Sequence, residues 1–177
     1  GSTSINVNDI TVLNATIYAA TDTGIYTADI TSTNLIDAAN WRLRFSGTFS
    51  KVITFSNKIY AVSNQNVFEL RGSLQVNRLS FTEAIVNVKS INSRLTVALS
   101  DSIIIYDESL SILGTNSVSS EFNFSLNTGG VINGTLYLAT SEYGILSGAI
   151  SSASYTEIHP EGPLSNDVFS IDVHNNN

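Results

Sequence analysis

The sequence predicts an all-β fold built from four similar units, and three observations support this prediction. First, one sequence pattern recurs: an alternating apolar segment, a tight turn containing Asn, a second apolar segment, a short turn and a third segment. Its copies cover residues 9–30, 52–70, 86–110 and 131–150. Second, the copies are spaced 42, 36 and 41 residues apart at their anchors, which are Ile17, Ile59, Leu95 and Leu136. Third, helical signals are nearly absent. Together these indicate a β-propeller of about four blades, each of four antiparallel strands.

The first strand of each copy alternates apolar and polar residues with a period of two, which is typical of a half-buried strand. Each is followed by a turn, at Asn14-Ala15, Ser56-Asn57-Lys58, Asn92-Ser93 and Asn133-Gly134. Asn suits such turns because it tolerates positive φ, and Asn-Gly is the strongest hairpin signal of the four. We therefore predict four hairpins with equivalent turn chemistry.

The remaining strands follow in the same order in every copy. Second strands are expected at residues 16–21, 58–63, 94–99 and 135–140, and third strands at 24–26, 66–69, 103–107 and 144–146. Fourth, outer strands are expected at 41–45, 75–81, 111–113 and 155–159, and these should be the least regular because they face solvent. Small Ala and Val at the inner positions favour blades that approach one another closely.

The sequence leads to separate expectations for the two ends of the chain and for its domain organisation. Residues 1–4 are expected to be a remnant of tag removal, 5–163 the four-blade segment, and 164–177 the first strand of a further blade and a tail. Residues 32–40 are the one stretch expected to form a turn of helix, capped by Thr31, Ser32 or Thr33. We expect an excerpt of a larger propeller, and a closed four-bladed ring is the alternative.

Composition limits the classes of function. The net charge is −7, and the eight basic residues are scattered, which argues against nucleic-acid binding because phosphate contacts need clustered Lys and Arg. Cys is absent, so no disulfide, thiolate nucleophile or Cys-type zinc site exists. There is no apolar run long enough for a transmembrane helix.

Two motifs carry a resemblance to a known family. Residues 20–26 (Ala-Thr-Asp-Thr-Gly-Ile-Tyr) and 139–145 (Ala-Thr-Ser-Glu-Tyr-Gly-Ile) resemble the A-T-x-x-G-[IL] core of two-component-regulator propeller repeats. Residues 162–171 resemble the G-P-x-S-N-x-V opening of a further repeat. The third copy departs from the pattern, since residues 99–102 lack the glycine. The combination is similar to the N-terminal propeller region of PorZ-like proteins of the type IX secretion system of Bacteroidetes.

This resemblance implies an exported, non-enzymatic protein of the cell surface or outer membrane. PorZ-like proteins are implied to assist type IX secretion or the attachment of cargo to surface lipopolysaccharide. The expected partners are therefore other secretion-system proteins or a surface polysaccharide. Related propellers imply the alternative, a periplasmic glycan-sensing segment of a hybrid two-component sensor.

Aromatic residues are the candidates for a carbohydrate groove, and each has a structural alternative. Tyr18, Tyr60 and Tyr137 occupy one repeat position, which favours packing between blades over ligand binding. Tyr143 departs from the repeat and stands beside a turn glycine, so we expect it to be exposed. Tyr143 and Trp41 are the predicted ligand-binding residues.

No catalytic residue, metal ligand or cofactor is predicted. His159 and His174 stand apart from any metal-ligand pattern and are expected to be ordinary polar residues. Asp107 and Glu108 are adjacent on a strand end, so they point to different faces and do not form the opposed carboxyl pair of a glycosidase. A glycan-processing enzyme is therefore the least favoured class.

A blade buries its faces only against neighbouring blades, so an excerpt leaves two apolar faces that need cover. We expect such a chain either to self-associate through these open faces or to be marginally stable. A compact, stable monomer would favour the closed ring.

Overall fold

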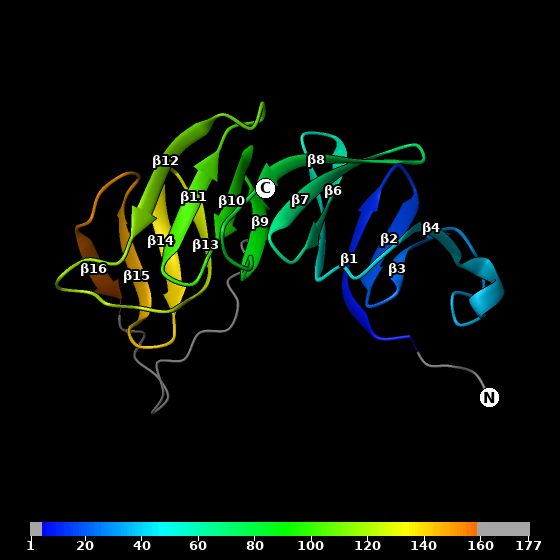
Figure 1. Ribbon diagram of the computed structural model, residues 1–177, viewed down its shortest axis with the longest axis horizontal. Helices are drawn as coiled ribbons and strands as arrows, with labels where there is room; N and C mark the ends of the chain where they lie inside the picture. Colours follow the sequence, from blue (N-terminus) through cyan, green and yellow to red (C-terminus); the bar gives the residue numbers. More distant parts are fainter. Residues whose placement is uncertain (1–4, 159–177) are drawn as a thin grey trace. The chain divides into compact units, whose positions relative to one another are not determined.

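The computed structural model describes residues 5–158 and consists almost entirely of strands in four antiparallel sheets of four strands each (Figure 1). This confirms the predicted all-β, propeller-type fold, and each sheet is called a blade below. The expected tag remnant at 1–4, the strand within 164–177, His159 and His174 lie outside the described residues.

The strands follow one another within each blade in chain order. Blade 1 holds β1 (Val7–Leu13), β2 (Thr16–Thr21), β3 (Gly24–Asp29) and β4 (Arg42–Ser46), and blade 2 holds β5 (Lys51–Phe55), β6 (Lys58–Ser63), β7 (Asn66–Arg71) and β8 (Leu74–Ser80). Blade 3 holds β9 (Asn87–Ile91), β10 (Arg94–Ala98), β11 (Ser102–Tyr106) and β12 (Ile112–Ser117), and blade 4 holds β13 (Leu126–Ile132), β14 (Thr135–Thr140), β15 (Gly144–Ala149) and β16 (Tyr155–Ile158).

The first hairpin of every blade has a two-residue turn at the predicted place. Both turn residues have positive φ in each case: Asn14 and Ala15, Ser56 and Asn57, Asn92 and Ser93, Asn133 and Gly134. Positive φ at both positions matches the right-handed twist of the flanking strands. Lys58, which the sequence placed at the edge of its turn, is already the first residue of β6.

The outer strands are less regular than the inner ones in blades 2 and 3 only, because the inner pairs β1–β2 and β13–β14 also contain a register shift and the outer pair β15–β16 contains none. The β3–β4, β7–β8 and β11–β12 pairs each contain a register shift, whereas the β2–β3, β6–β7 and β10–β11 pairs do not. The single helical turn, η1 (Ala38–Asn40), is shorter than the predicted 32–40 segment. Its cap is also different from the prediction: Asp37 accepts the backbone N–H of Ala39 at 2.9 Å, in place of Thr31, Ser32 or Thr33.

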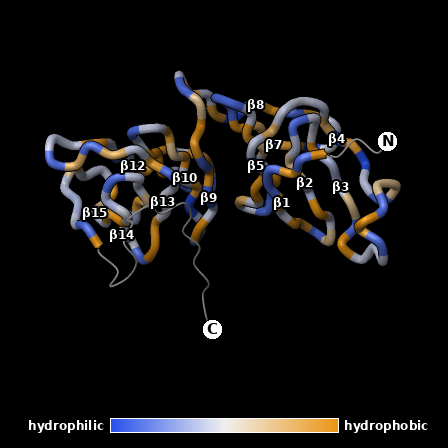
Figure 2. Tube along the Cα trace, turned by 90° about the horizontal axis from the view of Figure 1, so that it is seen from below, coloured by the Kyte–Doolittle hydropathy of each residue, from blue (hydrophilic) through white to orange (hydrophobic). Residues whose placement is uncertain are grey.

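The chain divides into two compact units, one ending at Glu83 with blades 1 and 2 and one beginning at Ala84 with blades 3 and 4. Each unit has its own apolar core between its two blades, and apolar segments recur on the strands of both (Figure 2). Ala20 and Ala61 lie in the first core and are fully buried, and Ala98 lies in the second. These small side chains let the sheets of one unit approach closely, as the sequence predicted.

Candidate functional site

The connection between β3 and β4 is the longest between adjacent strands of any described blade. It spans residues 30–41, whereas the corresponding connections span 72–73, 107–111 and 150–154. It contains η1 and is fixed by local hydrogen bonds: the Asn40 amide donates to the carbonyl of Asn34 at 2.6 Å, and the Trp41 indole N–H donates to the carbonyl of Leu35 at 2.9 Å. An insertion held by its own bonds and confined to one blade indicates a role beyond the repeat.

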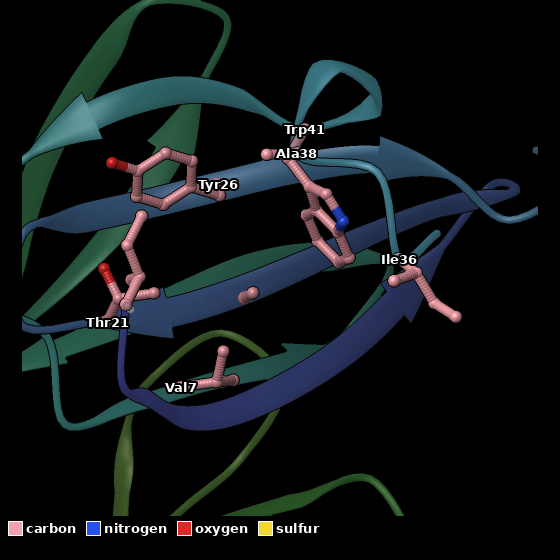
Figure 3. Close-up of a pocket in the computed structure, with 8 residues that line it drawn as sticks. Val7, Thr21, Tyr26, Ile36, Ala38 and Trp41 are labelled. Atoms are coloured by element: carbon pink, nitrogen blue, oxygen red, sulfur yellow. The ribbon is translucent and has the colours of Figure 1, made fainter. Parts of the chain in front are cut away.

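This insertion forms one wall of a cavity of about 310 Å³ on blade 1. The opposite wall is the sheet itself. The lining residues are Ile5, Val7, Ala19, Thr21, Tyr26, Ile36, Ala38 and Trp41. Figure 3 shows the rings of Tyr26 and Trp41 and the side chain of Val7 around the same space, with Ile36 at its margin.

The chemistry of this cavity suits an uncharged group with an apolar surface. Its lining side chains are apolar or hydroxyl-bearing, and none of the lining residues is charged. The Thr21 hydroxyl is bound within the sheet, since it donates to the carbonyl of Gly24 at 2.7 Å. The Tyr26 hydroxyl lies 3.3 Å from the Thr23 hydroxyl in an exposed position. Of the two side-chain hydroxyls that line the cavity, those of Thr21 and Tyr26, the Tyr26 hydroxyl is therefore the exposed one. An aliphatic side chain or the face of a sugar ring fits such walls.

The cavity belongs to a larger exposed face of blade 1, named here the open face. It is formed by Val7, Ile10 and Val12 of β1 together with Ala19 and Tyr26, which neighbour them on β2 and β3. Val7, Ile10 and Val12 are 58%, 62% and 44% exposed. Three exposed branched residues on one strand are unusual for the surface of a finished sheet.

The structure places the two predicted ligand-binding residues in different surroundings and in different units. Trp41 is half-buried and lines the cavity. Tyr143 is also half-buried rather than fully exposed, because its ring packs edge-on against Phe122 with 5.2 Å between centroids. Trp41 thus has a hollow beside it, whereas the Tyr143 ring is partly engaged in the core of the second unit.

Two of the three repeated tyrosines, Tyr18 and Tyr60, are used for packing. Tyr60 is 1% exposed and lies 6.1 Å from Phe55 between ring centroids. Tyr18 is half-buried against the core of the first unit. Burial raises the pKa of the Tyr60 hydroxyl, which keeps it protonated at neutral pH.

Sequence analysis missed a buried carboxylate in blade 2. Glu69 is 1% exposed and is surrounded by three cations. Arg71 donates to both of its oxygens, one at 2.9 Å, while Arg78 and Lys58 approach to 3.6 and 3.9 Å. The hydrogen bond from Arg71 holds the pKa of Glu69 below its usual value. Only strand pairing reveals this group, because its members are spread from position 58 to position 78.

Of the two adjacent carboxylates considered at the sequence level, Asp107 has a structural role. Asp107 Oδ1 accepts the Ser109 hydroxyl at 2.7 Å and the backbone N–H groups of Ser109 and Ser111 at 2.9 and 2.8 Å. The Ser109 hydroxyl and these N–H groups lower the pKa of Asp107, which thereby fixes a turn. Within residues 5–158, no three His, Cys, Asp or Glu side chains are grouped to hold a metal ion.

The A-T-x-x-G motifs gain a physical explanation from the structure. The Thr21 hydroxyl accepts the backbone N–H groups of Thr23 and Gly24 at 3.2 and 3.0 Å, so it closes the turn between β2 and β3. Thr140 accepts the N–H of Tyr143 at 3.0 Å in blade 4. At Gly24 a Cβ would lie 2.3 Å from the Phe45 carbonyl oxygen, so no larger residue fits. The two A-T-x-x-G motifs therefore have a structural role.

These features define the chain as a propeller-type β domain with an exposed apolar face and a cavity beside it. No protein-family model and no curated protein matches the chain in sequence. The structural comparisons do find similar folds. The extracellular domain of a proposed one-component system of B. thetaiotaomicron has a TM-score of 0.68 at 14% identity, covering 99% of this chain and 26% of that one.

Two further structures show the same fold. PorZ of Porphyromonas gingivalis, a bacterial surface component of the type IX secretion system, has a TM-score of 0.63 at 16% identity, covering 94% of this chain and 23% of PorZ. The AfRom2 CNH domain has a TM-score of 0.67 at 9% identity, covering 86% of this chain and 55% of that one. The chain therefore spans about half or less of these three proteins. At such identities the likeness establishes the fold alone.

Proposed function

We propose that this chain is a non-catalytic interaction module of an exported protein, acting through the open face of blade 1 and the cavity beside Trp41. The observation that carries the proposal is the combination of exposed apolar strand residues with a cavity built by an insertion unique to that blade. Rigid sheets that present one inserted loop are suited to recognition. The carboxylates Glu69, Asp107 and Glu142 are engaged with Arg71, Ser109 and Ser125, which supports a structural role for them.

The more specific role that we propose is that of PorZ-like proteins: assistance to type IX secretion, or to the attachment of cargo to surface lipopolysaccharide. The structural likeness to PorZ and the two sequence motifs support it. The described residues contain no helix that is long and apolar enough to cross a membrane. An exported protein at the cell surface or outer membrane is the proposed location, with the periplasm as the alternative.

A second candidate function is glycan sensing in a periplasmic signalling protein. The likeness to the extracellular domain of a one-component system favours it, as do the two aromatic rings of Tyr26 and Trp41 at one cavity. Aromatic faces pack against the apolar face of a sugar ring, while a hydroxyl such as that of Tyr26 bonds its edge. Both functions use the same cavity, so one titration tests them.

The test is a calorimetric titration of the chain with lipopolysaccharide and with surface polysaccharide purified from the source bacterium. Saturable heat that disappears in Trp41→Ala and persists in Tyr143→Ala would support recognition at the cavity. Because Trp41 is the single tryptophan of the chain, its fluorescence reports independently on the same site in the unmodified protein.

Three outcomes would count against the proposal. A flat titration of folded protein would exclude the polysaccharide as the partner. Heat that is lost only in Tyr143→Ala would move the site to the second unit. Release of new reducing sugar ends during incubation would overturn the non-catalytic assignment.

A further inference from the structure

One carboxylate of blade 2 has three cations around it, although the chain as a whole is acidic. Arg71 donates to both oxygens of Glu69, one of them at 2.9 Å, while Arg78 and Lys58 approach these oxygens to 3.6 and 3.9 Å. All four residues belong to β6, β7 and β8, and therefore to the first unit. Three of the eight basic residues of a chain with a net charge of −7 thus gather at one point.

Strand pairing explains how these side chains meet. Glu69 on β7 pairs with Tyr60 on β6. Lys58 and Arg71 stand two positions from this pair on the same strands, so they share its face of the sheet. On β8 a register shift leaves Arg78 without a pairing partner, which makes it the residue of a bulge. Bulges re-aim side chains, and the Arg78 guanidinium is directed at Glu69.

This cluster carries more positive charge than Glu69 balances, since three cations surround one carboxylate and leave an excess of two positive charges. At 3.6 and 3.9 Å, Arg78 and Lys58 stay beyond hydrogen-bonding distance of the carboxylate. The side chains of Lys58, Arg71 and Arg78 are 44%, 53% and 34% exposed, so an ion in solution reaches all three. Like charges held together repel one another, and an anion bound among them would relieve that repulsion.

The Arg71 guanidinium is held in place by Glu69. Its contact with both carboxylate oxygens fixes the orientation of the guanidinium fork, which has more N–H donors than one carboxylate takes up. A further cation reaches the turn that follows, because Arg44 donates to the carbonyl of Gly72 at 3.4 Å. A Cβ at Gly72 would meet no atom within 4 Å, so the turn beside Arg71 adjoins open space. The donors are therefore oriented and accessible.

We propose that Lys58, Arg71 and Arg78 form a binding site for a phosphomonoester group. At neutral pH such a group carries a charge of about −1.5 to −2 and three acceptor oxygens, which matches the excess charge and the three cations. Arginine binds phosphate through paired N–H donors, and lysine binds it as a point charge. A carboxylate has a single negative charge and would balance only half of the excess. Glu69 is a positioning residue of this site, since it orients Arg71.

This site goes beyond the proposed function. It lies on blade 2 and uses neither the open face of blade 1 nor the cavity beside Trp41. The ligand class that it adds is the phosphate group, either free in solution or carried by a lipid headgroup. Its failure in the experiments below would leave the proposed function standing.

The proposal is tested by titrating the full chain with inorganic phosphate at pH 7 and constant ionic strength, followed by two-dimensional NMR of the backbone amides. Chloride replaces phosphate in the reference, so that general screening cancels. Saturable shifts confined to β6, β7 and β8 are expected, with acetate binding at least about tenfold more weakly. Shifts that do not saturate, that spread over both units or that acetate reproduces equally would overturn the proposal.

Two variants each remove one cation and leave the hydrogen bonds between Arg71 and Glu69 in place. Arg78→Ala and Lys58→Ala should each weaken phosphate binding by at least about fivefold, whereas Lys58→Arg keeps the charge and should retain binding. Arg42→Ala is the matched control, because it removes the same charge from an exposed residue of β4. Circular dichroism checks that each variant is folded. Equal affinities of the wild type, Arg78→Ala and Lys58→Ala would also overturn the proposal.

Flotation with vesicles distinguishes the two sources of phosphate. Phosphatidylcholine vesicles are compared with vesicles that also contain phosphatidic acid, whose headgroup is a phosphomonoester. Recruitment to the second kind that is lost in Arg78→Ala and kept in Arg42→Ala would assign the site to a lipid headgroup. Saturable phosphate binding without recruitment would assign it to a soluble phosphate compound. Recruitment that Arg78→Ala leaves unchanged would place the lipid contact elsewhere and count against the site.

Discussion

At the scale of single residues, a threonine hydroxyl closes the turn between the second and third strands of blades 1 and 4. Thr140 is fully buried and accepts the N–H of Tyr143. Thr140→Val keeps the shape and removes the acceptor, so a backbone donor loses its partner. We expect the free energy of unfolding to fall by about 1–3 kcal/mol, measured by chemical denaturation.

The control for this prediction is Thr115→Val. Thr115 lies on β12 and is exposed, so its replacement should change stability by less than about 0.5 kcal/mol. Equal effects of the two substitutions would show that the Thr140 hydroxyl does not hold the turn.

The second prediction at this scale concerns Glu69 and pH. Its pKa is lowered in the folded state by the hydrogen bond from Arg71, so its contribution to stability is present above the unfolded carboxyl pKa of about 4.3. That contribution is lost as the pH falls through the lower folded value. Glu69→Gln should therefore be less stable than the wild type by about 1–2 kcal/mol at pH 7, and the difference should shrink below about pH 4.

Denaturant unfolding of both proteins at pH 7, 4 and 3 measures this difference. Comparison of the two chains at each pH cancels the contributions of the other carboxylates. A difference that grows on acidification would contradict the assigned direction of the Glu69 pKa.

At the scale of strands and loops, one buried amide connects blade 3 to blade 4. Asn116 on β12 donates to the carbonyls of Ala149 and Ser152 at 2.9 and 2.6 Å and accepts the N–H of Ser151 at 2.8 Å. Asn116→Ala leaves these loop groups without their partner. We expect a loss of about 3 kcal/mol in unfolding free energy and faster hydrogen exchange at the Ser151 amide.

Exposed Asn123 supplies the matched control, because Asn123→Ala removes the same amide from the surface of the same unit. It should leave the Ser151 exchange rate unchanged. If Asn116→Ala also leaves this rate unchanged, the β15–β16 connection is held by other contacts.

At the scale of the whole molecule, the exposed apolar face of blade 1 predicts self-association, which would make thermal stability depend on protein concentration. A partner that binds only the folded chain raises the midpoint of unfolding by mass action. The midpoint of the wild type, followed by circular dichroism, should therefore rise between micromolar and hundred-micromolar protein. Ile10→Lys on the open face should remove this dependence, whereas Leu74→Lys, at an exposed residue of the outer strand β8, should retain it.

The architecture could be predicted from the sequence because its signals are local. Alternation with a period of two, Asn-containing turns such as Asn133-Gly134 and a repeat of about 40 residues placed nearly all the strands. A hairpin is specified by its own turn chemistry, so no distant information was needed. The bounds and the cap of the helical turn were predicted less accurately, because several polar residues near Asp37 could equally cap a helix.

The candidate site could be predicted only in part. Trp41 was selected as an aromatic residue, but the cavity beside it requires β1, β2, β3 and the insertion to meet in space. Glu69 and its cations were missed for the same reason. Tyr143 was expected to be exposed, and its packing against Phe122 depends on a segment 21 positions away.

The sequence by itself determined the class of fold, the order of the strands and the absence of cysteine chemistry, since periodicity, turns and composition are properties of the chain alone. Only the tertiary structure decided which apolar faces are covered. Val7 begins β1 and Phe49 stands just before β5 at the equivalent position, yet Val7 is exposed and Phe49 is buried. The difference lies in whether a neighbouring blade packs against the residue, and burial depends on that neighbour rather than on the residue's own chemistry.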